Sequence, residues 1–175
     1  MTRFCCLVGV FARGHMLAAS LLLLAGAAHG EDKEPFAVVE LGGAGEWSLS
    51  GEGSNLGPTA AVEFAPIAHW LEIETGVSTL FGRGQTEWET GLLFKKPFDL
   101  SPNVEFEPGI GPAWMHASSG GRTTDSVAAE AALDFMFWPA GERKFGWFLE
   151  PSYSYSFGNN QRSLGVTVGL LITIP

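Results

Sequence analysis

The chain has few of the residues on which many catalytic and metal-binding sites depend. Its 175 residues include two cysteines, Cys5 and Cys6, and four histidines. The part after residue 30 has no cysteine, which excludes disulfides and thiol chemistry there. Histidine is too sparse to predict a zinc site, and the glycine-rich stretches lack the strand-to-helix context of a phosphate-binding loop. We therefore expect no cofactor and no metal centre built on histidine or cysteine.

Basic residues are also scarce in most of the chain. All 19 acids follow residue 30, together with only 8 of the 10 lysines and arginines, so this part has a net charge of −11. Nucleic-acid binding depends on a basic surface that neutralises phosphates. The charge balance therefore argues against a nucleic-acid partner.

The first 30 residues have the order of a secretory signal peptide. Two arginines precede an apolar run over residues 16–25, and small residues follow it. The run is shorter than the ~20 apolar residues of a membrane-spanning helix. Both cysteines lie before the run rather than at its exit, which excludes a lipoprotein signal. We predict a signal peptide over residues 1–30 and one domain over residues 31–175.

No segment after Pro35 has a sustained helical period, and eight segments instead alternate apolar and polar residues. They are Phe36–Leu49, Pro58–Ile67, Trp70–Phe81, Gln85–Lys95, Asn103–Ala117, Asp125–Trp138, Gly146–Phe157 and Arg162–Ile174. Turn residues connect them at 51–55, 66–69, 82–84, 96–99, 118–121, 139–144 and 158–160. These segments exceed the usual ~5–6 residues of strands in soluble proteins and suit tilted membrane-spanning strands of ~9–11 residues.

The alternation sorts the side chains into two faces, because successive residues of a strand point to opposite sides. One face holds large apolar and aromatic residues such as Trp47, Trp88 and Trp114 and no charge; the other holds glutamate with small residues. This is the pattern of a barrel with lipid outside and a polar interior. The alternative is a soluble, lipocalin-like barrel with the apolar face inside, but its rings would overfill the lumen.

Four prolines conflict with uninterrupted strands, because proline cannot donate to a strand ladder. We predict that they lie near strand ends or at bulges. They are Pro66, Pro108, Pro112 and Pro151.

The last strand resembles a known assembly signal. Gly169–Ile174 has the glycine and alternating apolar residues of the C-terminal β-signal of outer-membrane barrels, although it ends at Pro175 rather than at an aromatic residue. Residues 31–175 resemble the small eight-stranded outer-membrane β-barrel superfamily of OmpA-type and OmpW-like barrels. The resemblance implies an all-β, eight-stranded antiparallel up-and-down transmembrane β-barrel in the cell outer membrane. Its implied partners are outer-membrane lipid, lipopolysaccharide and the outer-membrane assembly machinery, and it implies a monomer.

A second resemblance concerns an enzyme family. Phe106–Gly111 resembles a strand of the lipid A deacylases, which are eight-stranded barrels that use a His-x-Ser pair and a later Glu. His116, Ser118 and Glu130 have this spacing. The family's pair, however, lies on the penultimate strand, where this chain has no histidine, and its Glu lies on the last strand. Alternation also directs His116 to lipid, beside Trp114, and Glu130 to the lumen, so we expect no such activity.

Acids that face the lumen form the candidate site. They are Glu40, Glu46, Glu63, Glu72, Glu74, Glu87, Glu89, Glu105, Glu107, Glu130, Asp134 and Glu150. With both termini in the periplasm, most of them fall in the periplasmic half, whereas Glu46, Glu87 and Glu89 fall in the outer half. Lys95 is the only base with the same parity.

The interior of an eight-stranded barrel is just wide enough for side chains, so these acids cannot all ionise without compensation. Three arrangements are open. The carboxyls share protons, water or cations fill the lumen, or bases at the rim fold inward. Those bases are Lys95, Lys96, Arg143 and Lys144.

Taken together, these patterns predict a non-enzymatic outer-membrane barrel with an acidic lumen and a structural or interaction role. The first alternative is a small cation-selective pore or cation-binding barrel. The second is a lipid A-modifying hydrolase.

Overall fold

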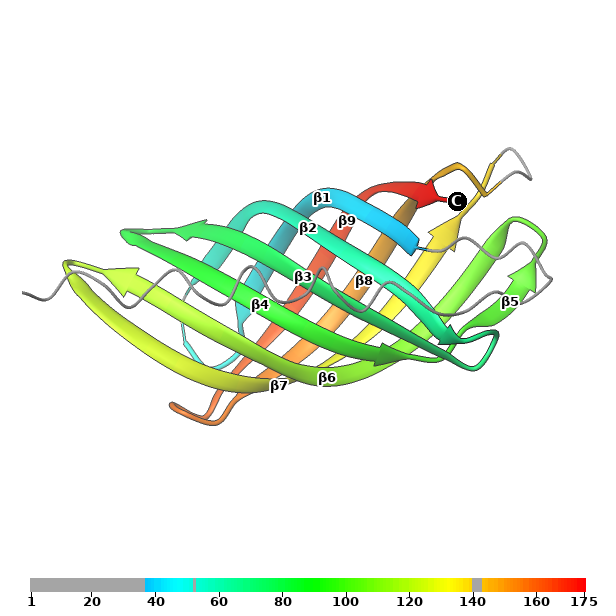
Figure 1. Ribbon diagram of the computed structural model, residues 1–175. Helices are drawn as coiled ribbons and strands as arrows, with labels where there is room; N and C mark the ends of the chain where they lie inside the picture. The colour runs from blue at the N-terminus through cyan, green and yellow to red at the C-terminus, as the bar shows by residue number, and fades with distance from the viewer. Residues whose placement is uncertain (1–36, 52, 140–142) are drawn as a thin grey trace, which may run out of the picture. The chain divides into compact units, whose positions relative to one another are not determined.

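Eight long strands and one short strand form a closed antiparallel sheet (Figure 1). The computed structural model describes residues 37–51, 53–139 and 143–175, and the predicted signal peptide lies outside them. The strands are β1 (Ala37–Ser48), β2 (Ser54–Ile67), β3 (Leu71–Gly82), β4 (Gln85–Lys95), β5 (Phe98–Ser101), β6 (Val104–Ser119), β7 (Arg122–Phe137), β8 (Phe145–Ser156) and β9 (Gln161–Ile174). In the described part of the chain, no helix is long and apolar enough to cross a membrane.

The long strands pair in chain order, and two further pairings close the ring. β1 pairs with β9, and β4 pairs with β6. This arrangement confirms the predicted eight-stranded antiparallel up-and-down barrel. We call the end at which β1 begins and β9 ends the terminal end, and the opposite end the distal end.

Two strand boundaries at the distal end differ from the sequence prediction. The predicted start of the second strand at Pro58 was wrong: β2 begins at Ser54, because Ser54–Gly57 pairs with Ala44–Trp47 of β1. The β6–β7 hairpin is also longer than predicted, since only Gly120 and Gly121 form its turn. Both have positive φ, 56° and 79°, which a tight two-residue hairpin turn requires and glycine adopts without strain.

The predicted turn at residues 96–99 is not a turn. Lys95 of β4 pairs with Gly109 of β6, and Phe98 of β5 pairs with Phe106, so β5 continues β4 in the same register. Pro97 lies between the two strands and has no N–H to donate, which accounts for the interruption. The chain reverses only after Ser101, and this hairpin extends the barrel wall at the terminal end.

The prolines have mixed outcomes. Pro66 lies at the end of β2, where the register with β3 shifts between Phe64 and Ile67, as predicted. The other three lie inside β6 and β8 and pair with residues of the neighbouring strands. The ladders on the other side of Pro112 and Pro151 skip the residues opposite them, which is consistent with a missing N–H donor.

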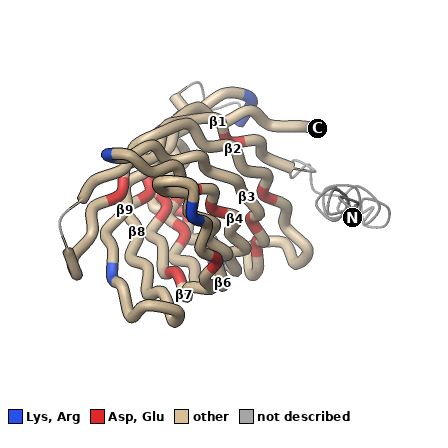
Figure 2. Tube along the Cα trace, turned by 90° about the vertical axis from the view of Figure 1, so that its left-hand side faces the viewer, with Lys and Arg blue, Asp and Glu red and all other residues tan. Residues whose placement is uncertain are grey.

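The two faces of the sheet are confirmed. Large apolar side chains cover the outside, with Trp88 50% exposed and Ile110 64% exposed, whereas the acids with lumen parity point inward. Figure 2 shows acidic residues along the strands and basic residues mostly toward the ends. Such an outer surface requires an apolar environment, because soluble monomers rarely expose contiguous apolar patches of this kind.

One interior feature was not predicted. At the terminal end the lumen holds an apolar cluster of Val38, Met136, Trp138, Phe148 and Leu171. Glycine makes room for it, because a Cβ at Gly169 of β9 would lie 2.7 Å from Phe148 Cε1. The lumen therefore combines acids with a packed apolar wall.

Candidate functional site

Lys95 is the centre of the acids in the terminal half of the lumen. The side chain, at the end of β4, is fully buried, and its Nζ contacts four carboxylates. The distances are 3.1 Å to Glu63 Oε2, 2.9 Å to Asp134 Oδ2 and 3.6 Å to Glu150 Oε2, and Glu74 is also in contact. These contacts join β2, β3, β7 and β8 to β4 across the interior. We call these five residues the Lys95 cluster.

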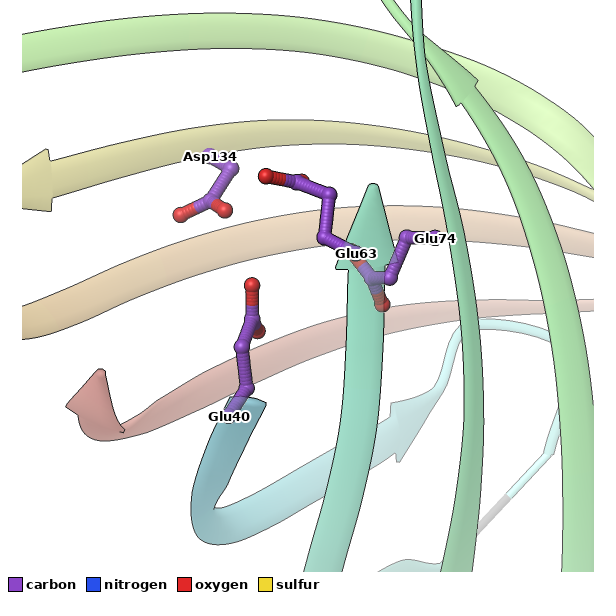
Figure 3. A group of neighbouring side chains, drawn as sticks. All are labelled: Glu40, Glu63, Glu74 and Asp134. Carbon is purple, nitrogen blue, oxygen red and sulfur yellow. The ribbon is translucent and has the colours of Figure 1, made fainter. Parts of the chain in front are cut away.

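The carboxylates around Lys95 come from separate strands and converge on one region (Figure 3). Glu40 of β1, Glu63, Glu74 and Asp134 each place one oxygen within 4.8 Å of the others. Because unpaired charges are costly in a buried environment, the ammonium of Lys95 is the principal compensation for this group. Of the three arrangements left open by the sequence, the inward-folded base is therefore present.

Arg143 makes a second compensation at the rim of the terminal end. The residue lies in the β7–β8 connection, and its guanidinium donates to Glu105 Oε2 at 2.9 Å and to Asp99 Oδ1 at 2.8 Å. Burial disfavours the charged form of Arg143, but the two carboxylates more than offset this and raise the pKa of the guanidinium. Lys96, which was also a candidate counter-charge, instead donates to the backbone oxygen of His69 and lies 5.4 Å from the Phe98 ring centroid.

Two small cavities lie on either side of the Lys95 cluster. The larger, about 80 Å³, is lined by Glu40, Glu74, Glu89, Glu130 and Glu150 among others. The smaller, about 40 Å³, lies toward the terminal end and is lined by residues that include Glu63, Glu72, Glu105, Glu107 and Arg143. Lys95 lines neither of them, although its partners border both. The first has room for a few water molecules, and the cluster separates it from the second.

Two further groups of acids lie in the lumen. Glu63 also approaches Glu72 and Glu107 near the terminal end, whereas Glu46, Glu87 and Glu89 form a separate group in the distal half. Glu130 lies between these levels on the wall of the larger cavity. The two groups of the terminal half therefore share Glu63, whereas the group in the distal half is separate from them.

His116 and Glu130 do not form a catalytic pair. His116 Nδ1 lies 2.8 Å from Asp125 Oδ1 on the outer face, and its ring is 5.7 Å from that of Trp114. Glu130 faces the interior cavity. A catalytic triad needs its base and its orienting acid within hydrogen-bond reach. His116, Ser118 and Glu130 therefore do not form the triad of a deacylase. The sequence did not predict the contact between His116 and Asp125, because Asp125 was expected to be the first residue of its strand. In the structure β7 begins three residues earlier, and the longer β6–β7 hairpin places Asp125 opposite His116.

Comparisons with solved structures support this architecture. Neisserial surface protein A aligns at 15% identity over 79% of this chain and 96% of its own, with a TM-score of 0.63. Ail, the attachment invasion locus protein of Yersinia pestis, aligns at 13% identity over 81% and 99%, with a TM-score of 0.57. The N-terminal β-barrel domain of Pseudomonas aeruginosa OprF aligns at 13% identity over 77% and 97%, with a TM-score of 0.56. No protein-family model and no curated protein matches the sequence.

These likenesses define the class of fold. The chain has the fold of the small eight-stranded outer-membrane barrels, as the C-terminal strand and the alternation predicted. At 13–15% identity the comparison establishes the fold and leaves the role to be argued from the interior and the outer face.

Proposed function

We propose that this chain is a non-enzymatic outer-membrane barrel with a closed acidic lumen and a structural or interaction role. The observation that carries the proposal is the Lys95 cluster, in which one buried ammonium links strands on different sides of the interior. The apolar cluster around Phe148 fills the neighbouring wall. Together they support a lumen filled by side chains rather than a continuous water path.

The outer face supports the proposed location. Its exposed rings and aliphatic side chains match an apolar band flanked by aromatic residues, as in outer-membrane barrels. Export by the predicted signal peptide and insertion by the outer-membrane assembly machinery would bring the chain there. Lipid and lipopolysaccharide are then its immediate partners.

Fractionation is the first test of this proposal. We expect the protein in the outer-membrane fraction. On a detergent gel run in the cold, the unheated protein should migrate as a folded band, and the heated protein should migrate at a different position. The shift is expected because a closed barrel resists the detergent until it is heated. A periplasmic product whose mobility does not change on heating would contradict the proposal.

Conductance measurements separate the closed barrel from a cation-selective pore. In planar bilayers we expect the purified protein to give no channel events, because the Lys95 cluster lies between the two cavities. Reproducible cation-selective events from the wild-type chain would favour the pore instead. A preparation of a porin in the same bilayers serves as the positive control for insertion.

A further inference from the structure

The distal half of the lumen holds acids that form no ion pair with a base in the described part of the chain. Glu46 of β1 and Glu87 and Glu89 of β4 each place one carboxylate oxygen within 4.8 Å of the others. Among the ion pairs formed by described residues, none includes these three acids. We call them the distal triad.

Buried oxygens of the distal triad lack hydrogen-bond partners. Glu87 is only 6% exposed, and its Oε1 is buried without a partner, as is Oε2 of Glu46. A buried carboxylate oxygen left unpaired loses its hydration without replacement, which is costly. Leu80, directly opposite Glu87 on β3 and 2% exposed, offers no donor from its side chain. Ala117, opposite Glu87 on β6, has no donor in its side chain either, and no described group donates to Glu87 Oε1 or Glu46 Oε2.

The Lys95 cluster shows what kind of partner such a group takes. Three of its acids, Glu63, Glu74 and Asp134, lie with Glu40 within the same 4.8 Å limit, and the ammonium nitrogen of Lys95 contacts these three. The distal triad has a similar arrangement of oxygens but no such nitrogen. The two groups belong to one lumen, and among the residues that the structure describes only the terminal group contacts a basic side chain.

We propose that the distal triad binds a divalent, oxygen-preferring cation of the Ca²⁺ type. Ca²⁺ accepts six to eight oxygens at about 2.3–2.6 Å, so opposite ligands lie about 4.6–5.2 Å apart. Oxygens within 4.8 Å of one another can thus surround it with little movement. The adjoining cavity of about 80 Å³, lined by Glu46 and Glu89, has room for the waters that complete the shell. Mg²⁺, which needs a closer octahedral shell, fits the triad less well.

This site goes beyond the proposed function, because cation binding in a closed lumen does not require conduction. Its affinity can be measured on the full chain refolded into micelles of an uncharged detergent and freed of metal with EDTA. We expect calorimetric titration with CaCl₂ to give one site per chain, with a Kd of about 0.1–1 mM, the range of sites that function at extracellular calcium levels. MgCl₂ is expected to bind more weakly.

Replacing two triad members tests the assignment. The double variant Glu87→Gln, Glu89→Gln is expected to bind calcium at least tenfold more weakly than the wild type. It is also expected to resist urea at least as well as the wild type in EDTA, because like charges have been removed. Ca²⁺ at ten times its Kd should raise the folded-to-unfolded ratio of the wild type about tenfold and that of the double variant far less.

Three further variants locate the site. Asp125→Asn removes an acid from the outer face and should leave calcium binding unchanged. Leu80→Lys places an ammonium opposite Glu87 and should abolish calcium binding while the barrel still folds.

The proposal is overturned if the wild type shows no saturable binding up to 10 mM CaCl₂, as expected for acids that share protons. It is also overturned if binding survives in the double variant, or is lost instead in Glu72→Gln, which would place the ion in the other carboxylate group.

Discussion

Replacing Lys95 with methionine is expected to destabilise the folded barrel by about 3–5 kcal/mol, the cost of leaving buried charges without their partner. The side chain of Lys95 is fully buried and contacts four carboxylates. Methionine preserves much of the length of lysine but removes the ammonium. The urea concentration at the unfolding midpoint, followed by tryptophan fluorescence in micelles, measures the loss. Lowering the pH should reduce it, because protonated carboxyls no longer repel one another.

Lys96→Met is the matched control for this variant. Lys96 is the next residue in the chain, but its Nζ donates to the His69 backbone oxygen and lies 5.4 Å from the Phe98 ring centroid. Its loss should cost less than about 1 kcal/mol, as for exposed charged contacts. If the two variants unfold at the same urea concentration, the Lys95 cluster does not stabilise the barrel.

A second control tests whether the cost comes from charge rather than from packing. In the triple variant Lys95→Met, Glu74→Gln, Asp134→Asn, the two closest carboxylates are neutralised together with the base. Replacing a buried ion pair as a unit is often close to neutral. We therefore expect this variant to recover much of the stability that Lys95→Met loses. No recovery would indicate that methionine packs poorly at this position.

The eight long strands could be predicted from sequence because each alternates apolar residues with polar or small ones over most of its length. The errors occur where that pattern is weak. Ser54–Gly57 is small and polar apart from Leu56, so the start of β2 was placed too late. Pro97, a residue that interrupts strands, was interpreted as part of a turn, whereas β4 and β5 on either side of it pair with β6 in one register. In both cases the strand boundary depends on pairing with a neighbouring strand, which the sequence of a single segment does not show.

The candidate site was predictable in part. Alternation assigned each acid to the lumen and identified Lys95 as the one base with the same parity. Alternation could not show that Lys95 contacts acids from four other strands. The position of each residue along the barrel axis depends on the stagger between neighbouring strands. The apolar cluster of Phe148 and Leu171 was missed for a similar reason. Those residues lie among small or acidic lumen positions in sequence and meet only when β8 and β9 pair with their neighbours.

Placing arginine at the middle of the outer face is expected to cost about 2–4 kcal/mol if that face contacts lipid. Val168 lies near the centre of the apolar positions of β9, faces outward and is 51% exposed. Val168→Arg should therefore lower the urea midpoint in lipid vesicles and reduce the yield of the folded, heat-shifted band. The reason is the transfer of a charged group into hydrocarbon.

Leu164→Arg is the matched control on the same strand and the same face. Leu164 is 46% exposed and lies four residues closer to the distal end, about 13 Å along the strand. An arginine there can reach the membrane interface, where the cost falls to about 0–1 kcal/mol. A large difference between the two variants is thus the signature of a bilayer around the barrel. Equal, small effects of the two variants would be expected of a face in water, where the cost of an arginine does not depend on its position along β9. Such a result would refute the outer-membrane assignment.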